Sequence, residues 1–284
     1  MFTRIRRAVE RRIARQIRHV VGQARLHTTS VRGHQITLDI ESEIEEFRAN
    51  TYAMKEPETL EWIERYFQPG DVMYDVGANI GLYSLFAAIH LERQCKIFAF
   101  EPEALNYAKL NANIHLNGLS GVIMPCCLAL ADQLCFDTFY LNPDNFEKIV
   151  AGQRLAAGSA LHSFGIAEDY NSAEFQPFHV QGMIGAPLDY LWQKWGLDFP
   201  NHVKIDVDGL EEKIIAGAAQ TLADRRLKSV LLEVSGKEGY ANPILQKLRE
   251  VGFTQVTEFA AHSSELLKGT PYEDSVNTIF IREF

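Results

Sequence analysis

The sequence DVGANIG, at residues 75–81, is typical of a ligand-binding turn between a strand and a helix. Gly77 allows the unusual backbone angles of such a turn, and Gly81 lets a ligand approach the backbone where the helix starts. Nicotinamide dinucleotides prefer G-x-G-x-x-G, whereas this turn has G-x-x-x-G after Asp75. An acid disfavours a diphosphate and suits ammonium and sulfonium charges. The turn therefore predicts S-adenosyl-L-methionine as cofactor; the alternative is a helix-capping turn without a ligand.

A second acid follows the next apolar strand. Glu101 comes directly after residues 96–100, about 20 residues beyond the glycine turn, where nucleoside-binding α/β folds place an acid that accepts the ribose hydroxyl protons. The alternative is that Glu101 caps the following helix. Taken with the turn, Glu101 favours the same cofactor.

A third group of acids lies in VKIDVDGLEE, at residues 203–212. A neutral hydroxyl is a poor nucleophile, and an acid that accepts its proton during methyl transfer would accelerate the reaction by about 10²–10⁴-fold. We therefore expect Asp206, Asp208 and Lys204 to be catalytic, with Asp206 closest to the reacting methyl group. The alternative is that Asp208 and Glu211 only stabilise the start of a helix.

Other chemistries have weaker support. Asp206, Asp208 and Glu233 could supply oxygen ligands for Mg²⁺, but no histidine accompanies them, and we expect no metal. The sequence lacks a G-x-S-x-G nucleophile elbow, so hydrolase chemistry has no visible nucleophile.

The elements that must position these acids alternate along the chain. Short, nearly continuous apolar strands followed by helices are typical of a parallel sheet covered on both faces. The predicted strands are 72–76, 96–100, 121–127, 203–207 and 229–234, and the predicted helices are 81–91, 103–116, 209–223 and 240–251. Before them we expect a strand and a helix within 34–50 and a helix over 56–67. Residues 253–259 and 276–281 predict an antiparallel closing pair, and 133–200 an insertion over the carboxyl ends of the strands.

The charge distribution separates a basic arm from an acidic body. The net charge is −9, although residues 1–27 carry eight arginines against the single Glu10. The acidic remainder argues against binding of a nucleic-acid backbone. The four cysteines have no metal-finger spacing, and the adjacent Cys126 and Cys127 are too close for an ordinary disulfide, which favours a reduced, cytoplasmic chain.

Residues 1–27 have apolar side chains at helical spacing among the arginines, so they predict a basic amphipathic helix. Three interpretations stay open for it. The helix lies on an anionic membrane surface, pairs with a partner helix, or is a poorly ordered tail that docks on the acidic body.

The ordered set of motifs resembles the FkbM-type methyltransferases over roughly residues 50–235. The motifs are DVGANIGLYSL, FAFEP, NIHLNGL at 113–119, LALAD at 128–132 and VKIDVDGLEEKIIAGA at 203–218. Asp208 stands where that family commonly has glutamate, which shortens the reach of the acid. The resemblance implies a Rossmann-like class I fold, with a mostly parallel seven-stranded sheet, and S-adenosyl-L-methionine as cofactor.

Carried over residue by residue, the resemblance also implies a binding site. Asp75, Gly77, Ala78, Asn79 and Gly81 would line the methionine and ribose part of the cofactor. Glu101 and Pro102 would lie at the ribose, and Ala129, Leu130 and Asp132 beside the adenine. Gly158–Leu161 and Leu188–Asp189 match family features of the insertion, where we expect a structural role for Ser159 and His162 ahead of substrate contact.

These inferences combine into one hypothesis. We expect an arm at 1–30, a strand–helix region at 31–70 and a methyltransferase domain at 71–284. The enzyme would methylate a hydroxyl of a sugar, glycan or related metabolite, in the cytoplasm, with the arm bringing it to the inner membrane face. The alternatives are a non-catalytic cofactor-binding or scaffold protein and a nicotinamide-dependent oxidoreductase.

Overall fold

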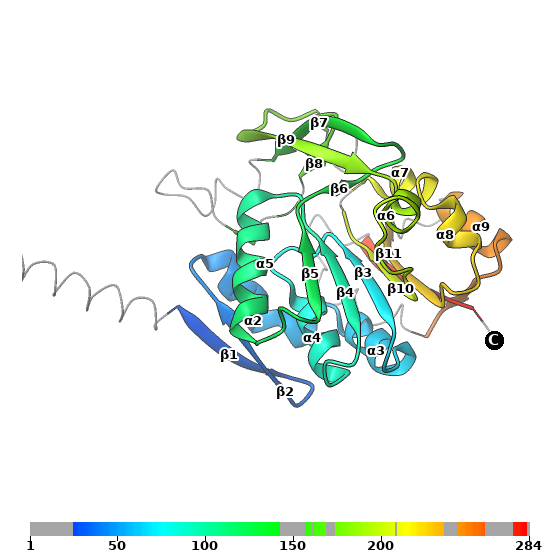
Figure 1. Cartoon of the computed structure of the whole chain (residues 1–284). Helices are drawn as coiled ribbons and strands as arrows, with labels where there is room; N and C mark the ends of the chain where they lie inside the picture. Colours follow the sequence, from blue (N-terminus) through cyan, green and yellow to red (C-terminus); the bar gives the residue numbers. More distant parts are fainter. Residues whose placement is uncertain are drawn as a thin grey trace, which may run out of the picture.

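The computed structural model describes residues 25–142, 157–158, 160, 162–168, 174–207, 209–235, 243–258 and 275–282. Their central sheet has the strand order β12–β13–β11–β10–β3–β4–β5 (Figure 1). The five strands from β11 to β5 are parallel to one another, and β13 runs antiparallel to both β11 and β12. The strands are β3 Val72–Val76, β4 Lys96–Phe100, β5 Ile123–Cys126, β10 His202–Ile205, β11 Ser229–Ser235, β12 Thr254–Val256 and β13 Ser275–Ile281.

Helices cover both faces of this sheet, because successive strand residues point to opposite sides. Met73 and Ile97 pack into one apolar core, and their neighbours Tyr74 and Phe98 into the other. The first core is closed by α2 Glu43–Lys55, α3 Pro57–Tyr66, α4 Leu82–His90 and α5 Ala104–Leu116. The second is closed by α6 Leu188–Gln193, α7 Glu211–Ala216, α8 Ala219–Ala223 and α9 Pro243–Glu250. The predicted fold class, a Rossmann-like class I methyltransferase with an antiparallel C-terminal pair, is confirmed.

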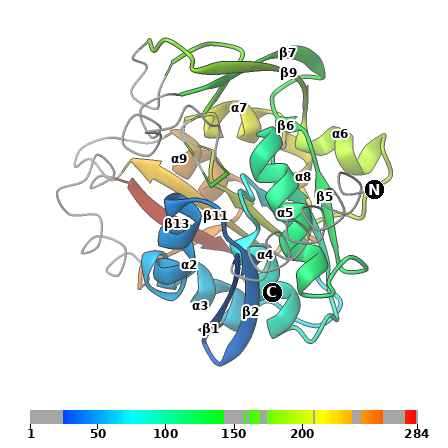
Figure 2. The ribbon, with the colours of Figure 1, turned by 90° about the vertical axis from the view of Figure 1, so that its left-hand side faces the viewer.

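A β-hairpin precedes the helices of the first face. Strands β1 Leu26–Val31 and β2 His34–Asp39 pair through a two-residue turn, in which Arg32 and Gly33 both have positive φ. The hairpin lies against α4 and α5, and α3 lies against α4 (Figure 2). The prediction of a helical arm was therefore wrong at the C-terminal end of the arm, because residues 26–31 form a strand that pairs with β2. Residues 1–24 lie outside the described part.

A second sheet with the order β6–β9–β7–β8 lies over the carboxyl ends of the central strands (Figure 1). Its strands are β6 Ala129–Leu130, β7 Cys135–Leu141, β8 Ser163–Phe164 and β9 His179–Ala186. Most of it belongs to the segment that the sequence predicts to be an insertion at this edge.

The predicted helix over 209–223 is two helices, α7 and α8. Gly217 lies at the break, where a Cβ atom would approach the carbonyl oxygen of Ala131 to 2.3 Å. Close packing against the chain beyond β6 therefore interrupts the helix. The predicted helix over 240–251 is α9, and residues 236–242 lie outside the described part.

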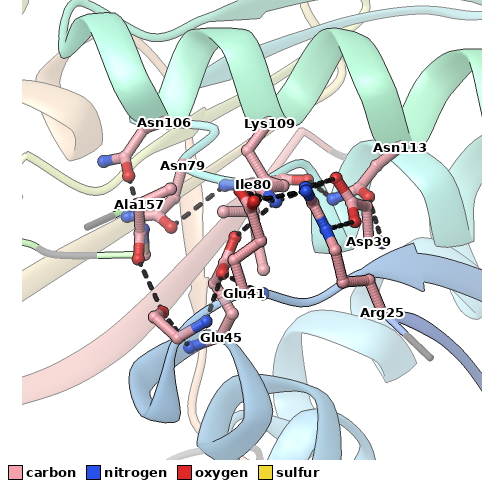
Figure 3. Close-up of polar contacts among 12 residues, drawn as sticks. Arg25, Asp39, Glu41, Glu45, Asn79, Ile80, Asn106, Lys109, Asn113 and Ala157 are labelled. Atoms are coloured by element: carbon pink, nitrogen blue, oxygen red, sulfur yellow. Dashed lines mark hydrogen bonds and ion pairs between the residues drawn. The ribbon is translucent and has the colours of Figure 1, made fainter. Parts of the chain in front are cut away.

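A buried ammonium group joins the N-terminal region to α5 (Figure 3). Lys109 is 5% exposed, and its Nζ lies 2.9 Å from Asp39 Oδ2, 3.1 Å from Glu41 Oε2 and 3.3 Å from Glu45 Oε1. Arg25 also pairs with Asp39 and Glu41. Three carboxylates from the segment after β1 thus converge on one lysine of the sheet's helical layer.

We expect Lys109→Met to lower the free energy of unfolding by about 3–5 kcal/mol, because it removes the cation beside the fully buried Glu45 carboxylate; Asp39 and Glu41 still pair with Arg25. Urea unfolding followed by circular dichroism measures the loss. Lys96→Met is the matched control: the Lys96–Asp198 pair is about half exposed on both sides, so its loss should change stability by about 0–1 kcal/mol. Equal effects of the two substitutions would contradict the structural role of Lys109.

Candidate functional site

The glycine turn after β3 lies between the ends of β4 and β10. The backbone amides of Gly77 and Ala78 both donate to the Phe100 carbonyl oxygen at 3.0 Å. Gly77 has φ of 79°, and a Cβ atom there would lie 1.9 Å from the Asp206 carbonyl oxygen. Only glycine allows this approach, so the turn and Asp206 are neighbours, as their places at the strand ends predict.

The rest of the turn is held by side chains. Asn79 has a φ of 51°, and its backbone N–H donates to Glu101 Oε2 at 2.7 Å. Asn113 of α5 donates to the Ile80 carbonyl oxygen at 2.9 Å and accepts the Asp39 amide at 2.9 Å (Figure 3). The N-terminal hairpin therefore supports the turn through α5. Gly81 precedes α4 in the left-handed conformation, as the turn requires.

Asp75 lies at the end of β3 and is 1% exposed. Its Oδ2 accepts the Ser84 hydroxyl at 2.6 Å, while its Oδ1 is buried without a hydrogen-bond partner in the described part of the chain. Burial raises the pKa of Asp75, against the opposing attraction of Lys204. An unsatisfied carboxylate oxygen here suits a cationic group of a ligand.

Glu101 is also buried, at the end of β4, one strand away from Asp75. It accepts the amides of Asn79 and Glu103, the latter at 2.9 Å. Burial raises the pKa of Glu101 to about 7. Its neighbour Pro102 accepts a hydrogen bond from Gln181 of β9, which ties the second sheet to this edge of the central sheet.

The three residues expected at the adenine lie at the joint between the two sheets. Ala129 and Leu130 form β6, pair with β9 and are buried at 4% and 3% exposure. Asp132 is exposed, two residues beyond the strand. Their contact with a cofactor stays a prediction.

Lys204 and Asp206 form the charged centre of this edge. Lys204 is 1% exposed, and its Nζ donates to Asp206 Oδ2 at 2.7 Å and lies 5.1 Å from the centre of the Tyr83 ring. Burial lowers the pKa of Lys204, but attraction to Asp206, Asp75 and Glu56 raises it overall. The Asp206 side chain is 28% exposed, so it can meet a substrate. Asp208 lies outside the described residues.

Sequence reasoning missed Glu56 and Lys55 at the junction of α2 and α3, and Tyr83 of α4. Glu56 is buried and pairs with Lys55 at 3.0 Å. Burial by itself raises the pKa of Glu56, but Lys55 and Lys204 lower it overall. Tyr83 falls within a quoted motif, but no spacing in the sequence connects Glu56 with Lys204.

Two further features are absent from the described residues. No group of three or more histidine, cysteine, aspartate or glutamate side chains there is arranged to hold a metal ion. No helix in the same part of the chain is long and apolar enough to cross a membrane.

Comparisons with known proteins agree with these observations. The family model described as "Methyltransferase FkbM domain" matches residues 75–254. The chain is 29% identical over 205 residues to 31-O-demethyl-FK506 methyltransferase FkbM of Streptomyces tacrolimicus, covering 67% of this chain and 75% of that protein. It is 25% identical over 194 residues to Methyltransferase 1 of Beauveria bassiana, covering 68% and 76%.

A solved structure, Precorrin-6y C5,15-methyltransferase from Geobacter metallireducens, is similar with a TM-score of 0.42 at 16% identity, covering 81% of this chain and 87% of that one. The family match, which begins at Asp75 and contains the glycine turn, Glu101, Lys204 and Asp206, is the stronger finding. This chain belongs to the FkbM methyltransferase family.

Proposed function

We propose that this protein transfers the methyl group of S-adenosyl-L-methionine to a hydroxyl oxygen of a sugar, glycan or related metabolite, with Asp206 accepting the hydroxyl proton. The family supports methyl transfer. The name of the Streptomyces relative, which refers to a 31-O-demethyl substrate, supports oxygen as the acceptor atom. The observation that carries the proposal is the partly exposed Asp206 carboxylate, held by a buried lysine beside the glycine turn.

The residues at this edge fit the cofactor. Asp75 offers a buried carboxylate oxygen that has no hydrogen-bond partner among the described residues, which suits the ammonium group. Glu101 accepts two backbone amides and interacts with the Asn106 side chain; because a carboxylate has about four acceptor sites, it retains acceptor capacity for a ribose hydroxyl. When bound, the cofactor supplies an electrophilic methyl group on a sulfonium centre.

The protein's own contribution is positioning and proton acceptance. Within the described residues Asp206 makes its side-chain hydrogen bond through Oδ2, to Lys204, so Oδ1 is available to the acceptor. During methyl transfer Asp206 would accept the proton that the attacking hydroxyl loses, while Lys204 holds the carboxylate in place through Oδ2. Correct alignment of oxygen, carbon and sulfur supplies most of the remaining acceleration.

The two alternatives have less support. A non-catalytic protein has no need of a partly exposed carboxylate anchored by a buried lysine. A nicotinamide dinucleotide would meet the Asp75 side chain at the turn that should hold its diphosphate. The cytoplasmic location and the membrane contact of residues 1–27 stay predictions, since residues 1–24 lie outside the described part.

We expect Asp206→Asn to lower the rate of methyl transfer by about 10²–10⁴-fold, because an amide cannot accept the proton. Binding of S-adenosylhomocysteine, measured by calorimetry, should stay within a few-fold of wild type. A screen of saccharide acceptors with labelled methyl donor measures the rate. Asp198→Asn, which changes a half-exposed acid, is the control; full activity of Asp206→Asn would remove Asp206 from the mechanism.

We expect affinity for S-adenosylhomocysteine to fall about tenfold from pH 8 to pH 6 in the wild type, because Glu101 with a pKa of about 7 is protonated at the lower pH and loses an acceptor for the ribose hydroxyls. Glu101→Gln should bind roughly 10–100-fold more weakly at pH 8 and lose most of this pH dependence. Calorimetry at both pH values measures it. Unchanged binding by Glu101→Gln would contradict the ribose assignment.

A further inference from the structure

Glu56 brings a third carboxylate into the surroundings of Lys204. It lies between α2 and α3, before the first residue that the family model matches. Asp206 comes from the end of β10 and Asp75 from the end of β3, so the N-terminal region adds its own charge to the edge formed by the two strands. The ammonium of Lys204 is attracted by all three acids.

The Glu56 carboxylate does not act as a cap for the helix that it begins. Glu56 is the N-cap residue of α3, yet its side chain makes no capping hydrogen bond. It is 8% exposed, with Oε1 3.0 Å from Lys55 Nζ and a long 3.5 Å contact from the Thr59 hydroxyl to Oε2. Tyr83 also contributes to lowering the pKa of Glu56. The Tyr83 ring in turn lies 5.1 Å from Lys204 Nζ. The Glu56 carboxylate is therefore free of a capping role and close enough to the charged centre for it and Lys204 to attract each other.

Lys55 is the counter-charge of Glu56 and is more accessible, with a side chain 38% exposed. Attraction to Glu56 and, more weakly, to Asp206 raises the pKa of Lys55, against the effect of burial. With all five groups ionised, the carboxylates of Glu56, Asp75 and Asp206 exceed the two ammonium groups by one negative charge. Such a balance stabilises a nearby cation more than a neutral molecule.

We propose that the Lys55–Glu56 pair sets the preference of the cofactor site for the sulfonium cation of S-adenosylmethionine over the neutral thioether of S-adenosylhomocysteine. The proposal rests on the proposed function, since it presupposes this cofactor. Glu56 strengthens the electrostatic attraction between the site and the sulfonium cation, and Lys55 weakens this attraction. The neutral thioether of the product does not experience it. The pair thus favours exchange of product for a new methyl donor after each turnover.

The test compares two dissociation constants by calorimetry, for S-adenosylmethionine and S-adenosylhomocysteine, at pH 7.5 and about 0.05 M salt, where screening is weak. The measured quantity is the ratio of the dissociation constant for S-adenosylhomocysteine to that for S-adenosylmethionine. A unit charge within roughly 10 Å, at an effective dielectric constant of about 20, changes the affinity for a cation by about tenfold. Glu56→Gln should therefore lower the ratio by up to about tenfold.

Lys55→Gln should raise the same ratio, by a smaller factor because solvent screens a half-exposed charge. Its opposite sign separates an electrostatic role from loss of structure, and its exposure makes it tolerant of substitution if Glu56→Gln fails to fold. Glu58→Gln is the matched control. Glu58 is also a buried glutamate, in the first turn of α3, but it accepts a hydrogen bond from Asn277 of β13 and is not among the acids that raise the pKa of Lys204, so its neutralisation should leave the ratio unchanged.

Each outcome decides one claim. Opposite shifts for Glu56→Gln and Lys55→Gln, with an unchanged ratio for Glu58→Gln, support the proposal. The proposal is overturned if neither substitution changes the ratio, or if both shift it in the same direction. It is also overturned if Glu58→Gln lowers the ratio as much as Glu56→Gln does. In each of these cases the proposed function still stands. A wild-type protein that binds neither molecule overturns the proposed function itself.

Discussion

The pairing of one buried ammonium group organises the functional edge of this protein. Lys204 is almost completely buried, and a charge in such a place is tolerated only with close partners of opposite sign. Asp206 supplies a direct partner, and Asp75 and Glu56 supply further attraction. Because these acids come from β10, β3 and the α2–α3 junction, the neutralisation of Lys204 also holds three separate segments in register.

The N-terminal region is therefore part of the working structure. The family match begins at Asp75, yet the segment before it supplies Glu56 to the charged centre and, through the Asp39 amide and Asn113, supports the backbone at Ile80 (Figure 3). Lys109 secures the same segment from the other side, with carboxylates of Asp39, Glu41 and Glu45. Two buried lysines thus attach this region to the sheet by charge pairing, in addition to its apolar packing.

The second sheet, β6–β9–β7–β8, covers the same edge, at the carboxyl ends of the central strands (Figure 1). Gln181 of β9 bonds to Pro102 and accepts the Ala104 amide at 3.2 Å, so this sheet is fixed directly beside Glu101. Methyl transfer depends mainly on alignment of the reacting atoms, and a cover that is hydrogen-bonded to this edge supports such alignment. Variation in such a cover changes which acceptor enters without altering the residues around the cofactor.

The order of strands and helices, the parallel sheet and the turn at 75–81 could be predicted from sequence, because strand alternation, glycine spacing and apolar runs are local signals. The acids Asp75, Glu101 and Asp206 could be found for the same reason: each lies in the last residues of a strand or directly after it, and parallel strands end at one edge. The strand β1 was missed, since it exists through pairing with β2, and the break at Gly217 was missed, since it results from contact with the chain beyond β6. The role of Glu56 could not be predicted from sequence, because its distance from Lys204 is set by how α2 and α3 pack on the sheet. Electrostatic attraction depends on that distance in space and not on separation along the chain.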